Sequence, residues 1–338
     1  MILVTGGAGY IGSHTCVTLL QAGYEVLVLD NLCNSKKESL HRVEIITGKK
    51  IHFVHADLRD LAALRKIFGN YSIDGVIHFA GLKSIGESIN SPLKYYDNNV
   101  SSSMVLVQVM TEFEVRALVF SSTAAVYGAA TTSPIPEESP LEASNPYGRS
   151  KLMIEQICTD LASANDSWSI AILRYFNPIG AHASGQIGEN VNDVPSNLMP
   201  NICRVAVSGN EQLEVYGNDY PTIDGTGVRD YIHVMDLAEG HMRALAWLKN
   251  NTGAHVFNLG TGHGFSVLEI VKTFEQVSGV SIPYKISPRR LGDLPVIYAD
   301  TSKAEKELGW KAELGIQAMC KDAWNWQVQN PQGYLGRK

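Results

Sequence analysis

The residues with the clearest chemical meaning are Tyr147 and Lys151, which lie four positions apart in the segment Tyr-Gly-Arg-Ser-Lys. On a helix, residues at this spacing share one face. A free phenol has a pKa of about 10 and is a poor base at neutral pH, but an adjacent ammonium group favours the phenolate and lowers that pKa. The pair therefore predicts general acid–base catalysis. Because this spacing is also common by chance, a pair on an exposed helix face is the alternative.

A glycine-rich segment at 5–12, Thr-Gly-Gly-Ala-Gly-Tyr-Ile-Gly, follows an apolar run and opens a helical pattern. Gly6, Gly9 and Gly12 permit a tight turn, close approach of the backbone to a pyrophosphate, and close packing of helix on strand. The helix N-terminus would then present free N–H groups and a partial positive charge to the phosphates. An ordinary turn is the alternative, but the context favours a dinucleotide site.

Asp30 ends the second apolar run, at the distance where a carboxylate accepts hydrogen bonds from the adenosine ribose. A carboxylate at this position repels a 2′-phosphate and therefore favours NAD over NADP. Lys36 and Lys37 lie nearby, and their positive charges would favour a 2′-phosphate and so slightly weaken the preference for NAD. The sequence predicts NAD as the cofactor. Its positive nicotinamide ring is expected to act together with the Lys151 ammonium in favouring the Tyr147 phenolate.

Three further segments follow apolar runs and are expected to border the same site. Asp57 and Leu58 can lie beside the adenine, and Phe79, Ala80 and Gly81 bring the backbone close to the cofactor. Thr123 lies in segment 121–128, after a fifth run. A hydroxyl at the carboxyl end of such a strand faces the ligand crevice and can hydrogen-bond the reacting oxygen. Capping of the strand end is the alternative for Thr123.

The elements that position these residues alternate between short strands and helices. Nearly continuous apolar runs predict strands at 2–4, 25–29, 51–54, 75–79, 117–120 and 169–173. Such runs are typical of parallel strands that are covered on both faces. The pattern predicts an α/β fold with a doubly wound, parallel, Rossmann-like sheet and right-handed crossovers.

The alternation of strand-like and helical segments becomes less regular after about residue 180. Segment 181–230 is rich in Gly, Asn, Pro and Asp and is expected to be mostly loop, with a helix near 197–208, and 303–328 is expected to be helical. We therefore predict an NAD-binding domain at 1–178 and a smaller C-terminal α/β domain at 179–338 that mainly binds substrate. Later segments such as 256–259 can return to the first sheet.

Composition narrows the class of protein. The chain has 338 residues, 45% of them hydrophobic and 18% charged, with a net charge of −6. This charge argues against a nucleic-acid partner bound through a basic face. Five dispersed cysteines without metal-binding spacing predict reduced thiols, no metal site and a cytoplasmic location. The first residues predict a strand rather than a signal peptide, and the apolar runs are too short to span a membrane.

Longer motifs carry a family resemblance. The start of the chain, segment 78–83 (His-Phe-Ala-Gly-Leu-Lys), segment 95–99, segment 121–128 and Tyr147 with Lys151 resemble the extended short-chain dehydrogenase/reductase family. Segments 174–178, 197–200, 227–234 and 290–293 look like those of the UDP-hexose 4-epimerases within that family. The resemblance covers essentially the whole chain.

The resemblance implies roles for single residues. Tyr147 matches the catalytic base, Lys151 its partner, and Thr123 the active-site hydroxyl. Together with the residues above, the expected NAD contacts are Gly6, Gly9, Tyr10, Ile11, Gly12, Asp30, Asn31, Asn34, Ser35, Asp57, Leu58, Phe79, Ala80, Gly81, Lys83, Asn98, Tyr147, Lys151 and Phe176. The expected UDP-sugar contacts are Thr123, Asn177, Asn197, Leu198, Tyr216, Arg229, Tyr231, Arg290, Asp293 and Ile297.

The chemistry implied by the resemblance is inversion at C4 of a UDP-hexose, UDP-glucose or UDP-galactose, through a 4-keto intermediate with tightly bound NAD. Two arginines suit a diphosphate, and an aromatic ring such as that of Tyr216 can lie against uracil. Ile297 matches a position beside the hexose 2-substituent, where a small residue admits N-acetylated sugars. Ordinary core packing is the alternative for Ile297. The resemblance also implies a homodimer.

Three rival functions remain to be weighed. A 4,6-dehydratase of this family carries a carboxylate pair after the active-site hydroxyl, whereas Ala124 and Ala125 follow Thr123 here. No feature of the sequence points to a decarboxylase acting on a UDP-uronate. A non-catalytic module that senses the redox state of NAD has no need of both Tyr147 and Lys151.

Overall fold

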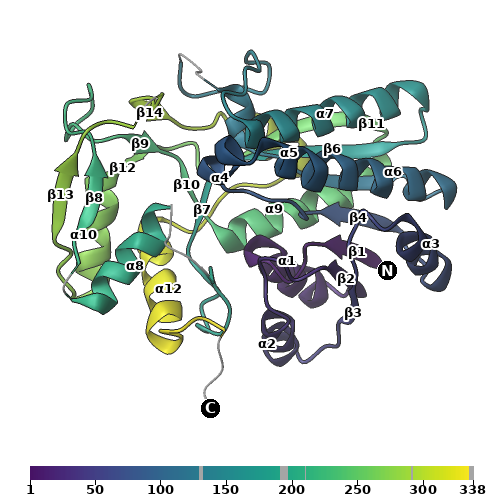
Figure 1. Cartoon of the computed structure of the whole chain (residues 1–338), viewed down its shortest axis with the longest axis horizontal. Coiled ribbons are helices and arrows are strands. Elements are labelled where there is room, and N and C mark those ends of the chain that lie inside the picture. Colours follow the sequence, from purple (N-terminus) through teal and green to yellow (C-terminus); the bar gives the residue numbers. More distant parts are fainter. Residues whose placement is uncertain (129–131, 191–196, 210, 291, 335–338) are drawn as a thin grey trace.

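The structure is a computed structural model and describes residues 1–128, 132–190, 197–209, 211–290 and 292–334. Seven parallel strands form one sheet in the order β11-β6-β5-β4-β1-β2-β3 (Figure 1). The strands are β1 (Ile2–Thr5), β2 (Val26–Asp30), β3 (His52–His55), β4 (Gly75–His78), β5 (Ala117–Ser121), β6 (Ser169–Tyr175) and β11 (Gly253–Leu259). The doubly wound sheet expected from the apolar runs is thereby confirmed.

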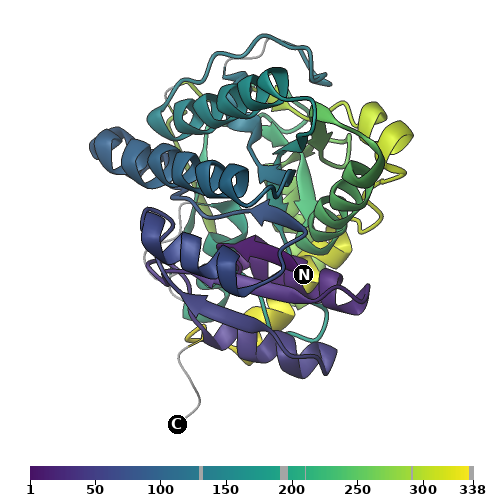
Figure 2. The same ribbon diagram turned by 90° about the vertical axis from the view of Figure 1, so that its right-hand side faces the viewer.

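Both faces of this sheet are covered by helices, which explains why its strands are apolar at successive positions. Val4 packs in an apolar cluster with helices on one face, and its neighbour Leu3 packs in a second cluster on the other. The first cluster includes side chains of α1 (Tyr10–Gln21), α2 (Glu38–Thr47) and α9 (Val234–Trp247); the second includes α3 (Leu61–Asn70), α6 (Ser102–Glu112) and α7 (Pro146–Ala164). Figure 2 shows the two helical layers with the strands between them.

Shorter helical elements lie after β4, β5 and α9. They are α4 (Ile85–Asn90), α5 (Pro92–Tyr95), the π-helix η1 (Tyr96–Ser101), and the 3₁₀ helices η2 (Ala124–Tyr127) and η3 (Leu248–Asn250). The π-helix runs directly into α6 at Ser102. Such π-helical turns often mark functional sites, because they re-aim side chains relative to a regular helix.

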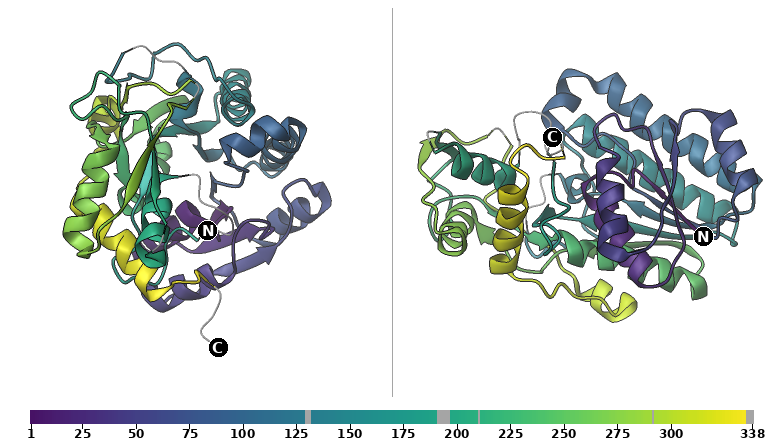
Figure 3. Two further views of the ribbon diagram at one scale, coloured as in Figure 1. Left: turned by 60° about the vertical axis from the view of Figure 1, so that its left-hand side comes forward. Right: turned by 90° about the horizontal axis from the view of Figure 1, so that it is seen from below.

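The rest of the described chain forms three small sheets and four helices, most of which stand beside the large sheet (Figure 3). The exception is the helix Ser302–Leu308, which packs in the first apolar cluster of the large sheet. The strands of the small sheets are β7 (Asn177–Ile179), β8 (Leu213–Tyr216), β9 (Val228–Arg229), β10 (Tyr231–His233), β12 (Phe265–Ser266), β13 (Tyr284–Ser287) and β14 (Val296–Ile297). The helices are α8 (Leu198–Ser208), α10 (Val267–Ser278), α11 (Ser302–Leu308) and α12 (Ile316–Gln329). Helix α8 confirms the helix expected near 197–208.

Segment 303–328, expected to be helical, forms two helices with a break between them. Gly309 adopts a left-handed conformation, with φ of 59°, and ends α11, so α12 starts afresh at Ile316. Glycine adopts this conformation without steric cost, which makes it a common helix terminator.

Strand β11 pairs in parallel with β6 along its whole length, from Gly253 beside Ser169 to Leu259 beside Tyr175. The large sheet is therefore completed by a segment from the later part of the chain. The division into domains at residue 178 stays a prediction. Within the described part of the chain, no helix is both long and apolar enough to cross a membrane.

Candidate active site

The glycine-rich turn between β1 and α1 is packed too closely for any larger residue. A Cβ added at Gly12 would lie 2.4 Å from the Gly6 carbonyl oxygen, and one at Gly6 would lie 2.7 Å from the Ala80 nitrogen. Gly6 also has a φ of +69°, which side chains rarely adopt. Since Gly9 at the N-cap of α1 has no side chain, the first N–H groups of the helix remain available to a phosphate.

Asp30 lies at the end of β2 beside this turn and is buried. One of its carboxylate oxygens accepts a hydrogen bond from the Ala8 N–H at 3.0 Å. The other accepts from the Leu32 N–H and the Ser35 hydroxyl, each at 2.9 Å. These donors fix the orientation of the carboxylate while it lines the cavity, as recognition of a ribose requires. Ser35 acts here through Asp30.

Next to Asp30, Asn31 donates a hydrogen bond to the Asp57 carboxylate at 3.0 Å. Arg59 hydrogen-bonds the same carboxylate at 2.9 Å and holds the pKa of Asp57 well below its usual range. Asp57 is therefore ionised and held in place at neutral pH.

One cavity runs along the carboxyl ends of β1, β2 and β4 and brings most of the predicted cofactor residues together. The predicted residues that line it are Gly6, Gly9, Tyr10, Ile11, Gly12, Asp30, Asn31, Asn34, Asp57, Leu58, Phe79, Ala80, Gly81, Lys83, Asn98, Tyr147 and Lys151. Ser35 and Phe176 are not among the described residues that line it. Phe176 instead packs in an apolar cluster with Val126 and Tyr127.

Tyr147 and Lys151 reach this cavity from the first turns of α7. The helix begins at Pro146 and is capped by Asn145, whose side chain accepts from the Gly148 N–H at 2.8 Å. The Lys151 ammonium donates to the Ser121 carbonyl at the end of β5, at 2.8 Å. Thr123 hydrogen-bonds the Tyr147 side chain. The structure therefore assembles the three predicted catalytic residues at one end of the cavity.

Burial is the main influence on the pKa values of Tyr147 and Lys151. Burial raises the pKa of Tyr147 well above its ordinary value, and the Thr123 hydrogen bond opposes that shift only in part. Burial also lowers the pKa of Lys151 to about 8. The lowered phenol pKa expected from the ammonium together with a nicotinamide ring therefore stays a prediction, and desolvation of the phenolate acts against it.

The structure also places residues in the site that the sequence analysis missed. Asn99, in the π-helix η1, accepts from the Leu82 N–H at 2.8 Å and donates to the Ser150 hydroxyl at 3.0 Å. It thereby ties the loop after β4 to α7. Tyr175, at the end of β6, lines the cavity near Tyr147. The sequence feature that could have pointed to Asn99 is the pair of adjacent asparagines in segment 95–99.

Glu189 was missed as well, and it pairs with a predicted cofactor residue. Its carboxylate lies 2.9 Å from the Lys83 ammonium, and both residues line the cavity. On the same side, the Tyr10 hydroxyl donates to the Gly180 carbonyl at 2.6 Å. Segment 180–190 therefore contacts the start of α1 through Gly180 and lines the cavity with Glu189 and Asn190.

The predicted substrate residues other than Thr123 lie on or beside the smaller sheets. Arg229 forms an ion pair with Asp293 at 2.6 Å, and the Arg290 guanidinium lies 4.0 Å from the centre of the Tyr216 ring. Tyr231 is buried and pairs with Asn177 across β10 and β7, while Ile297 pairs with Arg229 across β14 and β9. Asn197 and Leu198 begin α8.

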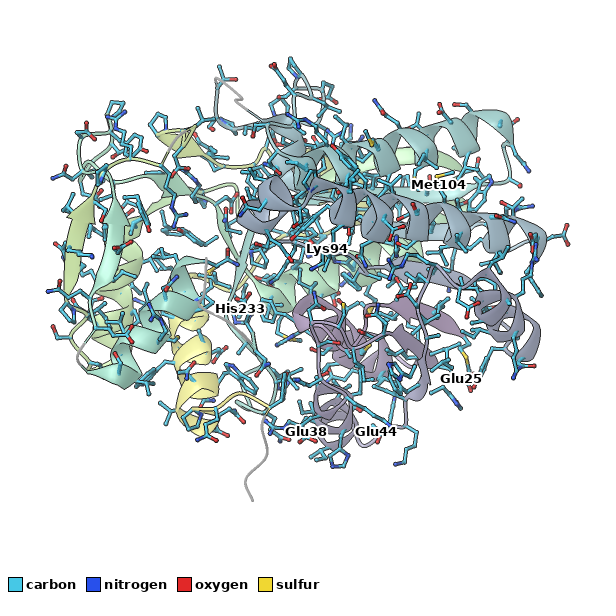
Figure 4. The ribbon with its side chains drawn as sticks, viewed as in Figure 1. Glu25, Glu38, Glu44, Lys94, Met104 and His233 are labelled. Carbon is cyan, nitrogen blue, oxygen red and sulfur yellow. The ribbon has the colours of Figure 1, made fainter. Side chains whose placement is uncertain are left out.

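Arg229 and Arg290 thus lie close to the rings of Tyr216 and Tyr231, around the small sheets beside the cavity of the large sheet. His233, labelled in Figure 4, lies at the junction between the two groups of elements. None of the described residues lining the cavity belongs to the predicted substrate set, but Thr123 of that set connects to the cavity through its hydrogen bond with Tyr147. Within the described ranges, no three His, Cys, Asp or Glu side chains are arranged to hold a metal ion.

Comparison with known proteins gives a consistent result. The profile of the NAD dependent epimerase/dehydratase family matches residues 2–260. The chain is 59% identical over 333 residues to the UDP-glucose 4-epimerase of Bacillus subtilis (strain 168), with 98% of each chain covered.

Two solved structures resemble the fold over nearly its full length. The UDP-glucose 4-epimerase of Bifidobacterium longum in complex with NAD⁺ and UDP has a TM-score of 0.94 and 52% identity, over 98% of this chain and 99% of that one. The enzyme of Stenotrophomonas maltophila with bound NAD and formylated UDP-arabinopyranose has a TM-score of 0.96 and 50% identity, over 98% of each chain.

Proposed function

The chain belongs to the NAD dependent epimerase/dehydratase family, and from that premise we infer that it is an NAD-dependent UDP-glucose 4-epimerase, an isomerase that interconverts UDP-glucose and UDP-galactose. The observation that carries this proposal is the joining of Tyr147, Thr123 and Lys151 at one end of a cavity whose other end is the glycine turn and Asp30. Acid–base groups and a dinucleotide site are thus adjacent, as redox-neutral inversion of an alcohol carbon requires.

The residues of the cavity fit NAD. The glycine turn leaves room only for backbone, and the uncapped start of α1 suits a pyrophosphate. The buried and oriented Asp30 suits the two hydroxyls of a ribose and repels a 2′-phosphate. When bound, NAD supplies a hydride acceptor at C4 of the sugar and a positively charged ring beside Tyr147.

Tyr147 is the acid–base group in our proposal. Its phenolate oxygen takes the proton from the sugar 4-hydroxyl during oxidation, and the resulting phenol returns that proton to the 4-keto oxygen during reduction. The hydrogen bond from Thr123 holds the phenol oxygen in place. Lys151, with its pKa lowered to about 8, still carries its charge at neutral pH and favours the phenolate.

Arg229 and Arg290 are proposed to bind the UDP diphosphate, with Tyr216 against the uracil. Tethering through the diphosphate leaves the 4-keto hexose free to turn over between oxidation and reduction. A 4,6-dehydratase is disfavoured, since Ala124 and Ala125 occupy the helical turn η2 after Thr123 where that chemistry needs an acid. We extend the proposal to UDP-N-acetylhexoses because Ile297 is smaller than an aromatic residue.

The test of the function is incubation of the purified protein with UDP-glucose and UDP-galactose, with the products resolved by NMR. We expect interconversion without net consumption of NAD or NADH. In Tyr147→Phe, turnover should fall by about 10²–10⁴-fold, the usual contribution of a positioned acid–base group, while NAD stays bound. Wild-type protein that carries NAD but turns over neither sugar would instead support the NAD-sensing module.

We also propose that the protein is a homodimer. A groove between α6 and α7 is lined by Met104, Val105, Val107, Ile157 and Leu161 together with three polar residues. Met104, labelled in Figure 4, is 54% exposed in the single chain. Two such faces can pack on each other about a twofold axis and bury this apolar surface.

The proposed dimer predicts that Met104→Glu yields monomers in sedimentation velocity, because dimerisation would bury an unpaired charge. Ile45→Glu, on the exposed face of α2, is the matched control and should leave the dimer intact. Equal sedimentation of both variants would remove the α6–α7 face from the interface.

We propose a cytoplasmic location as well. All five cysteines are unpaired in the structure, including the exposed Cys33. Unpaired thiols are typical of a reducing compartment.

A further inference from the structure

We infer that Glu155 and Arg174, a buried ion pair behind the active site, are positioning residues that hold Thr123 against Tyr147 and keep a carboxylate beside Lys151. This inference rests on the proposed function, because Glu155 and Arg174 would act through the three residues proposed to catalyse the reaction. Neither side chain was singled out by the sequence analysis, and neither is among the described residues that line the cavity.

The pair itself is closed and almost fully shielded from water. The side chains of Glu155 and Arg174 are each 4% exposed. Arg174 donates from Nη2 to Glu155 Oε2 at 2.7 Å and from Nε to both carboxylate oxygens at 3.1 Å. Its remaining nitrogen, Nη1, donates to the Glu137 carbonyl at 2.9 Å and to the Tyr127 hydroxyl at 3.2 Å. Each guanidinium nitrogen thus has an acceptor, so the arginine has one well-defined position.

Through this arginine the carboxylate connects three segments that build the site. Glu155 lies on α7, two helical turns after Tyr147. Arg174 lies on β6 immediately before Tyr175, which lines the cavity. Tyr127, whose ring lies 5.0 Å from the Arg174 guanidinium, belongs to the turn that follows Thr123.

Three consecutive residues after Phe120 each contact one member of a single face of α7. The Ser121 carbonyl accepts from Lys151 at 2.8 Å, and the Ser122 hydroxyl donates to Glu155. Thr123 hydrogen-bonds Tyr147. Since residues 147, 151 and 155 are spaced by four, they share one helix face. The contact between Ser122 and Glu155 therefore fixes the end of β5 against α7. The contacts of Ser121 and Thr123 then hold Lys151 and Tyr147 in place.

The carboxylate of Glu155 also acts on Lys151 through its charge. Glu155 raises the pKa of Lys151 and so opposes the effect of burial. Two other titratable groups face Lys151, His78 from β4 and His241 from α9. Burial lowers the pKa of these imidazoles to about 3 and about 4, so both are neutral near pH 7. Of these three groups, Glu155 is the one whose charge favours the ammonium form of Lys151.

A purely structural pair would behave differently from a positioning pair. Loss of packing alone would lower the melting temperature without moving the pH dependence of the reaction. The proposed role predicts that removing the carboxylate charge makes Lys151 lose its proton at lower pH. The activity would then fall at a lower pH on the alkaline side. Affinity for the UDP-sugar should stay near normal, because its diphosphate is proposed to bind at Arg229 and Arg290.

The experiment measures kcat and KM of the holoenzyme on UDP-galactose from pH 6 to 10. In Glu155→Gln, which keeps the shape of the side chain, we expect kcat to fall about tenfold and KM to stay within twofold. The alkaline limb, the fall of kcat at high pH, should move to lower pH by about one unit. Glu155→Asp keeps the negative charge, but its shorter side chain moves the carboxylate away from the Ser122 hydroxyl. It should therefore lose kcat while the limb stays in place.

The matched control is Glu112→Gln, which removes the carboxylate of the exposed Arg65–Glu112 pair, where both hydrogen bonds are 2.7 Å long. This variant should keep the wild-type profile. If Glu155→Gln does not fold, Glu155→Leu combined with Arg174→Met removes both charges without leaving one unpaired. Reduced kcat with normal KM in that double variant supports the inference.

Wild-type kcat and an unmoved alkaline limb, in Glu155→Gln or in the double variant, would overturn the inference. Absence of turnover in the wild-type protein would overturn the proposed function instead, so the two failures are distinguishable.

Discussion

The substitution Gly12→Ala tests the dinucleotide site through a single added methyl group. Its Cβ would lie 2.4 Å from the Gly6 carbonyl oxygen and 2.7 Å from the Gly7 Cα, both backbone atoms that cannot swing aside. Ordinary contact requires at least 3.4 Å. The start of α1 and the glycine turn must therefore separate by about 1 Å, which typically costs about 1–3 kcal/mol of folding stability.

The same displacement moves the N–H groups of α1 away from the phosphates. A hydrogen bond to a charged group contributes about 1.5–3 kcal/mol. Losing one therefore weakens NAD binding by roughly 10- to 100-fold, at about 1.4 kcal/mol for each factor of ten. We expect Gly12→Ala to be purified with little NAD.

The assay is release of NAD from purified protein, quantified by chromatography, together with the melting temperature with and without added NAD. Gly86→Ala is the control, because a Cβ there meets no atom within 4 Å. It lies in the short helix α4, where alanine is favoured over glycine by about 0.5–1 kcal/mol. A full complement of NAD in Gly12→Ala would refute the assignment of the turn to the pyrophosphate.

Two further predictions concern substrate choice and pH. Ile297→Tyr should reduce kcat/KM on UDP-N-acetylhexoses by roughly ten- to hundredfold and much less on UDP-glucose, since overfilling a packed site costs about 1–3 kcal/mol; equal losses on both sugars, or no N-acetyl activity in the wild type, would contradict it. Burial lowers the pKa of His14 and His78 to about 3 and of His241 to about 4. Because an unfolded histidine has a pKa near 6.5, the unfolded chain takes up protons that the folded chain does not, and stability should be lost as pH falls from about 6.5 toward 4. Calorimetry at pH 7.5 and 5.0 checks this, and an equal or higher melting temperature at pH 5.0 would count against it.

Features that depend on neighbouring residues could be predicted from the sequence. The strands of the large sheet are read from continuous apolar runs, because both faces are buried. The glycine turn is read from spacing, since only glycine tolerates a carbonyl 2.4 Å from the position of a Cβ. Tyr147 and Lys151 line the same cavity from one face of α7, because four residues make about one helical turn.

Features that depend on distant residues required the tertiary structure. Glu189 reaches Lys83 across more than a hundred positions, and Arg174 reaches Glu155 from another element. No local pattern marks either pair, because each is created by the packing of separate segments. The sequence predicts that segment 256–259 can return to the large sheet, but its pairing with β6 is decided by the same packing of separate segments.

The ionisation of the site is decided in the same way. The spacing of Tyr147 and Lys151 predicts that a cation lies near a phenol, and this is a local property. Whether the phenol becomes more or less acidic depends on how much water the whole fold removes from it. Burial raises the pKa of Tyr147 and lowers that of Lys151, because a charge loses solvation when distant segments close over it.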